Sequence, residues 1–530
     1  MNKLKFALLF IPLFFSCKKV LDTSPYGSIS DASAFTTAAK CALALNGVYD
    51  AAQGVFYVTG STENRGYPFG AASIYQGDVR GEDLVNIAAF LQITYQATWN
   101  ATNANTAGMW KGLYELINKA NICIAGFRGA SGTAITTTIA AQYEAECRLL
   151  RAMAHFECVI NWARPYLENA GSSLGVPWRD FPINTSTAVN SILNSPRMSV
   201  AGIYTNILID LDYAETNLPA ASGGISYRAT KAAAIALKMK VKLHKGDWAG
   251  VKLEGDKLVP ATAIVYPIVP TVTVSPIGGY ALTATPDGAF VNNNSLESIF
   301  SIKNDALDAP SVNGSLLKLL ASTSVTGGRG LIGISPIIYN NPAWLCDDKR
   351  RTSLTIFGGN ANGNSSWFIT KYRDASSGDY APMVRYAEVL LMLAEAEARL
   401  NAGVSSRAVD LLNVVRNRSL NTPLTQQYTV GGFANQVALV RAILMERRIE
   451  LLGEGRRWSD ISRLANDANY STGGIPAKAL NGTDGAAVYV CNSSYIPGQA
   501  AIPYSDPRFL WPIPASEILS NPVIVQNPGY

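Results

Sequence analysis

The residues of this sequence that could do chemistry are aromatic rings, amides and charged groups set in segments without a regular pattern. Two such segments, 53–97 and 247–380, are rich in glycine and asparagine. Rings in irregular segments cannot all belong to the core, and a ring displayed on a loop can stack on a ligand while amides and charges align its polar groups. The candidate ligand-binding residues are Asp78, Arg80, Trp99, Trp344, Trp367 and Tyr372.

For each of these candidates, ordinary packing in the core or in a loop is the alternative interpretation. Four other tryptophans lie within stretches of regular periodicity, and we assign them to structure. They are Trp110, Trp162, Trp458 and Trp511.

Catalysis has little support in the residue pattern. The two histidines, His155 and His244, lie near no Ser or Cys in a recognisable nucleophile turn. Glycine-rich fingerprints for phosphates or dinucleotides are absent. A glycosidase would need two carboxylates across a cleft, and the sequence does not place any two opposite one another. The carboxylates available for such a pair are Asp78, Glu82, Asp83, Asp347 and Asp348. We expect no catalytic residues and no cofactor.

The cysteines do not predict a metal site. Six of them follow Cys17, and none forms a CxxC motif or a cluster with histidine. Cys147 and Cys158 share one predicted helix, where eleven residues span about 16 Å, too far for a disulfide. We interpret the six as buried free thiols that behave as small apolar residues. They are Cys41, Cys123, Cys147, Cys158, Cys346 and Cys491.

The N-terminus predicts a lipid anchor. Lys3 and Lys5 precede an apolar run from Phe6 to Phe15 that is too short to span a bilayer. Ser16 then precedes Cys17, as in a bacterial lipoprotein signal. We expect residues 1–16 to be removed, Cys17 to carry the lipid, and 17–30 to act as a tether.

Charge argues against nucleic acid as a partner. Removal of Lys3 and Lys5 lowers the basic total from 44 to 42, against 39 acidic residues. The Lys and Arg residues are scattered along the chain and do not gather into a stripe.

The elements that must hold the candidate residues are helices. Residues 385–400 carry apolar side chains at helical spacing, Gly403 suits the left-handed residue that ends such a helix, and Ser405 or Ser406 can cap the next. A third helix ends in 445–458, where seven of fourteen residues are charged. We interpret that end as a turn held by Arg–Glu pairs.

Further helices are predicted over 136–162, 199–218 and 230–245, whereas 247–380 is read as strands and loops. Paired helices with small residues between them are typical of tetratricopeptide repeats. The predicted fold is therefore mainly α, a tetratricopeptide-like helical-repeat scaffold with large irregular loop and short-strand insertions. It forms one domain, 31–530, with a helical part at about 31–246, an insertion at about 247–380 and a second helical part at about 381–530.

Several motifs in the C-terminal 150 residues resemble the SusD/RagB family of nutrient-binding outer-membrane lipoproteins. They are Arg385-Tyr386-Ala387-Glu388-Val389-Leu390-Leu391, Ala394-Glu395-Ala396, Leu412-Asn413-Val414-Val415-Arg416-Asn417-Arg418, Glu446-Arg447-Arg448-Ile449-Glu450-Leu451, Glu454-Gly455-Arg456-Arg457-Trp458-Ser459-Asp460-Ile461 and Gln526-Asn527-Pro528-Gly529-Tyr530. Each is short, but their order and spacing make chance agreement unlikely.

The resemblance implies a cell-surface protein that binds a glycan or oligosaccharide without chemistry and lids a SusC-like, TonB-dependent β-barrel transporter in the outer membrane. Two alternatives stay open. The same scaffold could bind a peptide or protein, or two of the carboxylates could make a glycosidase.

Overall fold

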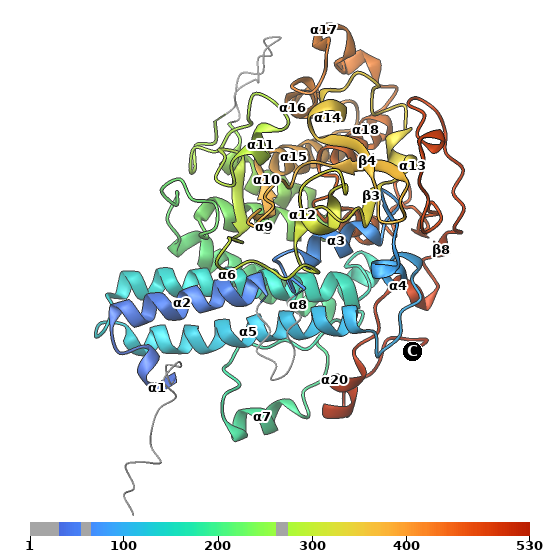
Figure 1. Ribbon diagram of the computed structural model, residues 1–530. Coiled ribbons are helices and arrows are strands. Elements are labelled where there is room, and N and C mark those ends of the chain that lie inside the picture. Colours follow the sequence, from blue (N-terminus) through green and yellow to red (C-terminus); the bar gives the residue numbers. More distant parts are fainter. Residues whose placement is uncertain (1–30, 55–64, 261–273) are drawn as a thin grey trace, which may run out of the picture.

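The computed structural model describes residues 31–54, 65–260 and 274–530 (Figure 1). The expected signal segment 1–16, the lipidated Cys17 and the tether 17–30 lie outside the described residues. Within the part of the chain that is described, helices dominate and the strands are short, as predicted.

The N-terminal half is a stack of helices. They are α1 (Asp31–Ala34), α2 (Ala38–Gln53), α3 (Ala72–Val79), α4 (Gln92–Gln96), α5 (Ala104–Ala130), α6 (Thr137–Trp162), α7 (Ser186–Ile192), α8 (Val200–Asn217), α9 (Lys231–His244) and α10 (Trp248–Leu258). The long helices start where a side-chain oxygen accepts a backbone N–H of the first turn. The residues that do so are Thr37, Asn103, Thr136, Ser199, Thr230 and Asp247.

The described chain also contains short strands, of which four lie in the insertion together with several short helices. The strands are β1 (Leu84–Asn86), β2 (Ser298–Ile302), β3 (Ile332–Ile334), β4 (Thr355–Gly359), β5 (Ser365–Ile369), β6 (Ala381–Arg385), β7 (Gly474–Ile475) and β8 (Ile502–Pro503). They pair antiparallel in twos, as β1–β3, β2–β6, β4–β5 and β7–β8. The short helices are α11 (Gly288–Val291), α12 (Leu316–Leu320), α13 (Pro336–Tyr339) and α14 (Lys349–Ser353).

One part of the insertion differs from the expected strands and loops. Residues 248–258 form α10, which packs along α9 and α15. Sequence reading missed this helix because its glycines, Gly250 and Gly255, resemble loop composition. Gly255 instead allows close packing, since a Cβ there would lie 2.9 Å from Leu393.

The C-terminal helices complete the stack. They are α15 (Tyr386–Leu400), α16 (Ser406–Asn417), α17 (Pro423–Gln426), α18 (Gln436–Glu450), α19 (Arg457–Arg463) and α20 (Ala515–Ser520). Neighbouring helices pack in the order α5, α6, α8, α9, α10, α15, with α16 and α18 both on α15. This succession of paired helices is the tetratricopeptide-like scaffold that the sequence predicted.

Helix α15 is the centre of this stack. All its residues from Tyr386 to Ala398 are buried, which exceeds the single apolar stripe expected from the sequence. Ser405 caps α16, as predicted. The prediction for Gly403 was wrong: α15 ends at Leu400, and Asn401 follows in extended backbone at φ −99° and ψ 137°. The helix therefore needs no left-handed residue to end.

The cysteines separate into two groups. Cys346 and Cys491 form a disulfide, so the interpretation of all six as free thiols was wrong for this pair. Their separation of 145 residues left no local signal in the sequence. Cys41, Cys123, Cys147 and Cys158 are buried free thiols, as expected.

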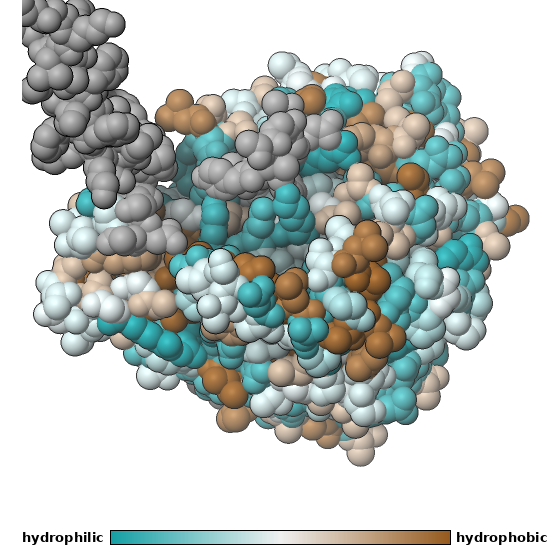
Figure 2. All heavy atoms as spheres, turned by 90° about the horizontal axis from the view of Figure 1, so that it is seen from below, coloured by the Kyte–Doolittle hydropathy of each residue, from teal (hydrophilic) through white to brown (hydrophobic). Residues whose placement is uncertain are grey.

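The underside of the molecule carries α7 and α20, which lie low in Figure 1. The Asn521 side chain donates to the carbonyl oxygens of Ile192 (3.1 Å) and Ser195 (2.9 Å) and so joins the two segments. Seen from below, hydrophobic residues form patches among hydrophilic ones (Figure 2). No helix in the described ranges is long and apolar enough to cross a membrane.

Candidate functional site

Five of the six candidate ligand-binding residues lie in the interior. Asp78, Arg80, Trp99, Trp344 and Tyr372 are each at most 5% exposed. Trp367 on β5 is half-buried. The structure thus brings together Asp78, Arg80 and Trp99 beneath the C-terminal segment, and Trp344 and Trp367 around Tyr339. Ligand binding by these residues stays a prediction.

Arg80 holds the first group together. Its guanidinium lies over the rings of Trp458 (3.4 Å to the centroid) and Trp511 (4.5 Å). It also donates to Asn161 Oδ1 and to the carbonyl oxygen of Phe509. Aromatic faces and two acceptors hold this cation inside the protein, although its Nε has no hydrogen-bond partner among the described residues. The assignment of Trp458 and Trp511 to structure is confirmed, and so is that of the buried Trp110 and Trp162.

Asp78 and Tyr372 attach to the turn that follows α18. Asp78 accepts the backbone N–H groups of Gly455 and Arg457, both at 3.0 Å. Burial raises the pKa of Asp78 to about 6, although these two hydrogen bonds oppose the rise. The Tyr372 hydroxyl donates to the carbonyl oxygen of Gly453 at 2.9 Å. Both side chains therefore hold a glycine-containing turn.

The other carboxylates considered for a glycosidase also have partners. Glu82 pairs with Arg457 (2.6 Å), Asp83 with Arg448, and Asp348 with Arg350 (2.8 Å). Exposed Asp347 accepts hydrogen bonds from Gln426. Each of these carboxylates is held by a cation or an amide, and Glu82 and Asp83 share Arg448 and Arg457.

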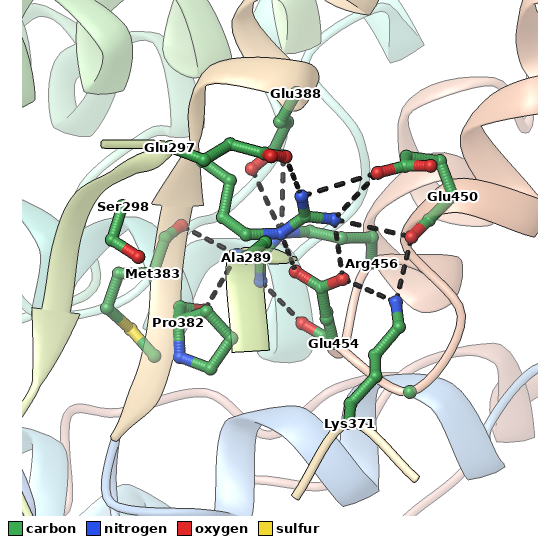
Figure 3. Close-up of polar contacts among 12 residues, drawn as sticks. Ala289, Glu297, Ser298, Lys371, Pro382, Met383, Glu388, Glu450, Glu454 and Arg456 are labelled. Atoms are coloured by element: carbon green, nitrogen blue, oxygen red, sulfur yellow. Dashed lines mark hydrogen bonds and ion pairs between the residues drawn. The ribbon is translucent and has the colours of Figure 1, made fainter. Parts of the chain in front are cut away.

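A buried network of ion pairs supports the scaffold, as the Arg–Glu interpretation of 445–458 predicted. Arg385 lies at its centre and donates to Glu297, Glu450 and Glu454, three carboxylates labelled in Figure 3. Among the described residues the network joins five cations to five carboxylates, so its charge is balanced. The members are Arg350, Lys371, Arg385, Arg416, Arg418, Glu297, Asp348, Glu446, Glu450 and Glu454.

The network shifts the ionisation of its acids. Burial alone would raise the pKa of Glu454, but the charges of Arg385 and Lys371 outweigh it and lower the value to about 2. The pKa of Glu450 is also lowered to about 2, because the charges of Arg418, Arg385 and Arg350 outweigh the effect of its burial. These acids are ionised and paired at neutral pH.

The surface best suited to a ligand is the aromatic face, which we define as Tyr339, Phe357, Trp367 and Tyr489. Phe357 and Trp367 are directly opposite one another on β4 and β5, with ring centroids 5.5 Å apart. Trp367 stacks on Tyr339 at 4.9 Å and 24° between planes. Tyr489 contacts Tyr339 and Phe357 edge-on. Phe357 is 38% exposed and Trp367 is half-buried, so this supported pair of rings is partly open to solvent.

A polar rim adjoins the aromatic face at the turn between β4 and β5. Asn364 Nδ2 donates to Asp484 Oδ1 at 2.8 Å, and Asn360 Nδ2 donates to Asp484 Oδ2 at 3.0 Å. Asn362 Nδ2 donates to the carbonyl oxygen of Ile87 at 3.2 Å. Asn362 and Asn364 are exposed, so this rim offers amides and a carboxylate beside the exposed rings.

Sequence reasoning found Trp367 but missed Phe357, Tyr489 and the rim. One signal could have located them. The run of glycine and asparagine at 358–364 lies between two short apolar runs, which is a hairpin pattern. That pattern would have placed Phe357 opposite Trp367.

The disulfide lies close in sequence to rings at this face. Cys346 follows Trp344 by two residues, and Trp344 contacts Tyr339 edge-on at 5.9 Å. Cys491 follows Tyr489 by two residues. The bond therefore links the loop that follows Tyr339 and carries Trp344 to the loop that follows Tyr489.

Comparison with known proteins agrees with this architecture. The SusD family model matches residues 359–530, and a model described as starch-binding associating with outer membrane matches 19–243. SusD-like protein P2 of Formosa agariphila is 25% identical over 555 residues, with 96% of each chain covered. The chain belongs to the SusD/RagB family.

Solved structures share the fold. A SusD superfamily protein from Bacteroides fragilis superposes with a TM-score of 0.73 at 25% identity, covering 93% of this chain and 99% of that one. Surface glycan-binding protein A from Bacteroides uniformis has a TM-score of 0.67 at 20% identity, covering 93% and 99%. The mainly α, tetratricopeptide-like fold is thus confirmed.

Proposed function

We propose that this protein captures a glycan or oligosaccharide on the aromatic face and does no chemistry on it. The observation that carries the proposal is the exposed Phe357–Trp367 pair beside the polar rim. Sugar rings have apolar faces that stack on aromatic rings, while their hydroxyls pair with amides and carboxylates. Membership of the SusD/RagB family and the name of the glycan-binding relative support the same ligand class.

The cellular setting belongs to the same proposal. Cys17 anchors the mature chain by lipid to the outer membrane, facing outward, and a SusC-like TonB-dependent transporter accepts the bound glycan. The starch-binding, outer-membrane description of the matching family model supports this setting. Co-purification from detergent-solubilised outer membrane tests the transporter partnership, and Cys17→Ser tests the anchor by releasing the protein from the membrane fraction.

Ligand binding is tested by calorimetry of the mature chain against laminaripentaose, maltopentaose, xylopentaose and a peptide panel. We expect binding to a glycan and a loss of about tenfold in affinity for Trp367→Ala, roughly 1.4 kcal/mol. Trp248→Ala is the matched control. Trp248, the first residue of α10, is also half-buried, but its ring packs against the guanidinium of Arg399 on α15. Binding to peptides with silent glycans would overturn the proposal, and release of reducing sugar would show a glycosidase.

A further inference from the structure

A second cavity, of about 650 Å³, lies between α2 and two loops. Its walls include Asn46, Gly47 and Gln53 of α2, Tyr227 of the loop before α9, and Lys303 and Asp305 of the loop after β2. No residue of the aromatic face or its rim lines it. The volume falls within the range of about 300–1,000 Å³ that small-molecule ligands occupy.

One wall of this cavity is a supported aromatic ring. Tyr227 is half-buried and meets Tyr380 edge-on, with centroids 5.8 Å apart and an interplanar angle of 82°. Lys303 Nζ lies 5.4 Å from the centroid of the Tyr227 ring. These two contacts fix the ring, so that it presents a preformed apolar surface.

A buried polar group at the cavity is only half satisfied. Gln53 is 2% exposed, and its Nε2 donates to Asn304 Oδ1 and to the carbonyl oxygen of Asp308, both at 3.1 Å. The amide orientation is thereby fixed. Within the described ranges, Gln53 Oε1 has no hydrogen-bond partner. A buried acceptor without a donor is unfavourable, and a hydroxyl or a water would satisfy it.

The charges of the lining select against anions. Lys303 pairs with Asp305 at 2.7 Å, and Arg228 pairs with Glu146 at 2.6 Å. Both cations of the lining are therefore paired with carboxylates, and the lining carries two further carboxylates, Asp50 and Asp308. An uncharged, hydroxyl-rich ligand fits this balance better than a sulfated or carboxylated one.

We propose that this cavity is a second saccharide site, which takes a short neutral oligosaccharide or a chain end. This proposal rests on the proposed function, because it assumes that both sites bind the same class of ligand. Two separate sites on one rigid chain let a long glycan bind at two points, which raises its overall affinity without a new contact at either site.

Gly47 provides a way to close the cavity without damaging the fold. It lies inside α2, and a Cβ built there meets nothing within 4 Å. Gly47→Gln therefore fills the cavity and favours the helix, since glycine is a poor helix former. Gly129→Gln is the matched control, because Gly129 is equally open on α5 and does not line this cavity.

The experiment is calorimetry of the mature chain with laminaripentaose, maltopentaose and xylopentaose, and a thermal melt of each variant. We expect two sites in the wild-type chain and in Gly129→Gln, and one in Gly47→Gln. Trp367→Ala should keep both sites, with the aromatic-face site about tenfold weaker. Tyr227→Ala should weaken the second site about tenfold.

The outcomes separate the two proposals. A single site that Trp367→Ala weakens and Gly47→Gln leaves unchanged would overturn the second site alone. A folded wild-type chain that binds none of the three sugars would overturn both. The second site would also be overturned by a crystal soaked in sugar that shows sugar bound at the aromatic face and only water in the cavity beside Gly47.

Discussion

Arg385 and Glu454 form a two-point ion pair in the protein interior, with Nε 2.8 Å from Oε2 and Nη2 2.8 Å from Oε1. The pair joins the end of β6 to the turn after α18. It also connects two parts of the scaffold that lie 69 residues apart in the sequence. Lys371 donates to the same Glu454 at 2.6 Å, so one carboxylate contacts two buried cations.

Glu454→Gln should therefore destabilise the fold strongly, because Arg385 and Lys371 stay buried with less negative charge around them. We expect the free energy of unfolding, from urea titration at neutral pH, to fall by about 3–5 kcal/mol. Asp506→Asn is the control, since its pair with Arg508 (2.7 Å) is exposed on the arginine side and should change stability by less than about 1 kcal/mol. Equal losses for the two variants would refute a special role for the buried network.

Stability should fall in acid. Glu82, Glu450 and Glu454 have pKa values of about 2 in the fold, against about 4.3 for an unfolded glutamate. A lowered folded pKa stabilises the fold above the unfolded pKa, and that contribution is lost as pH falls toward 2. The pKa of Asp78 is raised to about 6, so this group has the opposite effect: it makes the fold more stable as the pH falls from about 6 to about 4.

Urea titrations across this range give the measurement. We expect the loss below about pH 4 to exceed the gain from Asp78, because Glu254 and Asp460 also have lowered pKa values and add to the loss. Glu454→Gln should flatten the acid limb relative to wild type. An unfolding free energy that stays constant down to about pH 3 would contradict the sign worked out here.

Gly455→Ala should be more harmful than its backbone angle alone explains. Gly455 has φ +78°, and a Cβ there would lie 2.6 Å from Ile74 Cα on α3. Gly473 has a similar φ of +73° but open space around its Cβ position. Gly473→Ala should lose about 1 kcal/mol from backbone strain, and Gly455→Ala at least about 2 kcal/mol more. Thermal melts that shift equally would show that the turn can move away from α3.

Removal of the Cys346–Cys491 disulfide should cost about 2–5 kcal/mol of stability. The double variant Cys346→Ser, Cys491→Ser and the dithiothreitol-treated wild type should unfold at the same urea concentration, below that of the oxidised wild type. Dithiothreitol should not affect the double variant, which controls for effects of the reductant elsewhere. We also expect weaker glycan binding without the bond, because it links the loops of Trp344 and Tyr489; unchanged affinity would show that packing alone holds the aromatic face.

Much of the scaffold could be predicted because its signals are local. The apolar spacing in 385–400 predicted α15, Ser405 predicted the start of α16, and the charge pattern of 445–458 predicted the ion pairs. The prediction that Gly403 ends α15 was wrong, because a helix can also end at solvent-exposed residues in extended backbone.

The candidate site was harder to predict because burial is decided by tertiary contacts. Asp78, Arg80 and Trp99 look like loop residues, but the C-terminal residues 455–458 and 509–511 pack over them. Phe357 looks like an ordinary strand residue, and only its pairing with Trp367 makes it part of an exposed surface. The disulfide could not be predicted either, because long-range packing is what brings its two cysteines together.

The complete burial of α15 has a consequence for the order in which the chain loosens. A helix surrounded by α9, α10, α16 and α18 can expose its amides only when several neighbours detach together. In deuterium exchange its amide hydrogens should be the last to be replaced, long after those of the hairpin that carries Trp367.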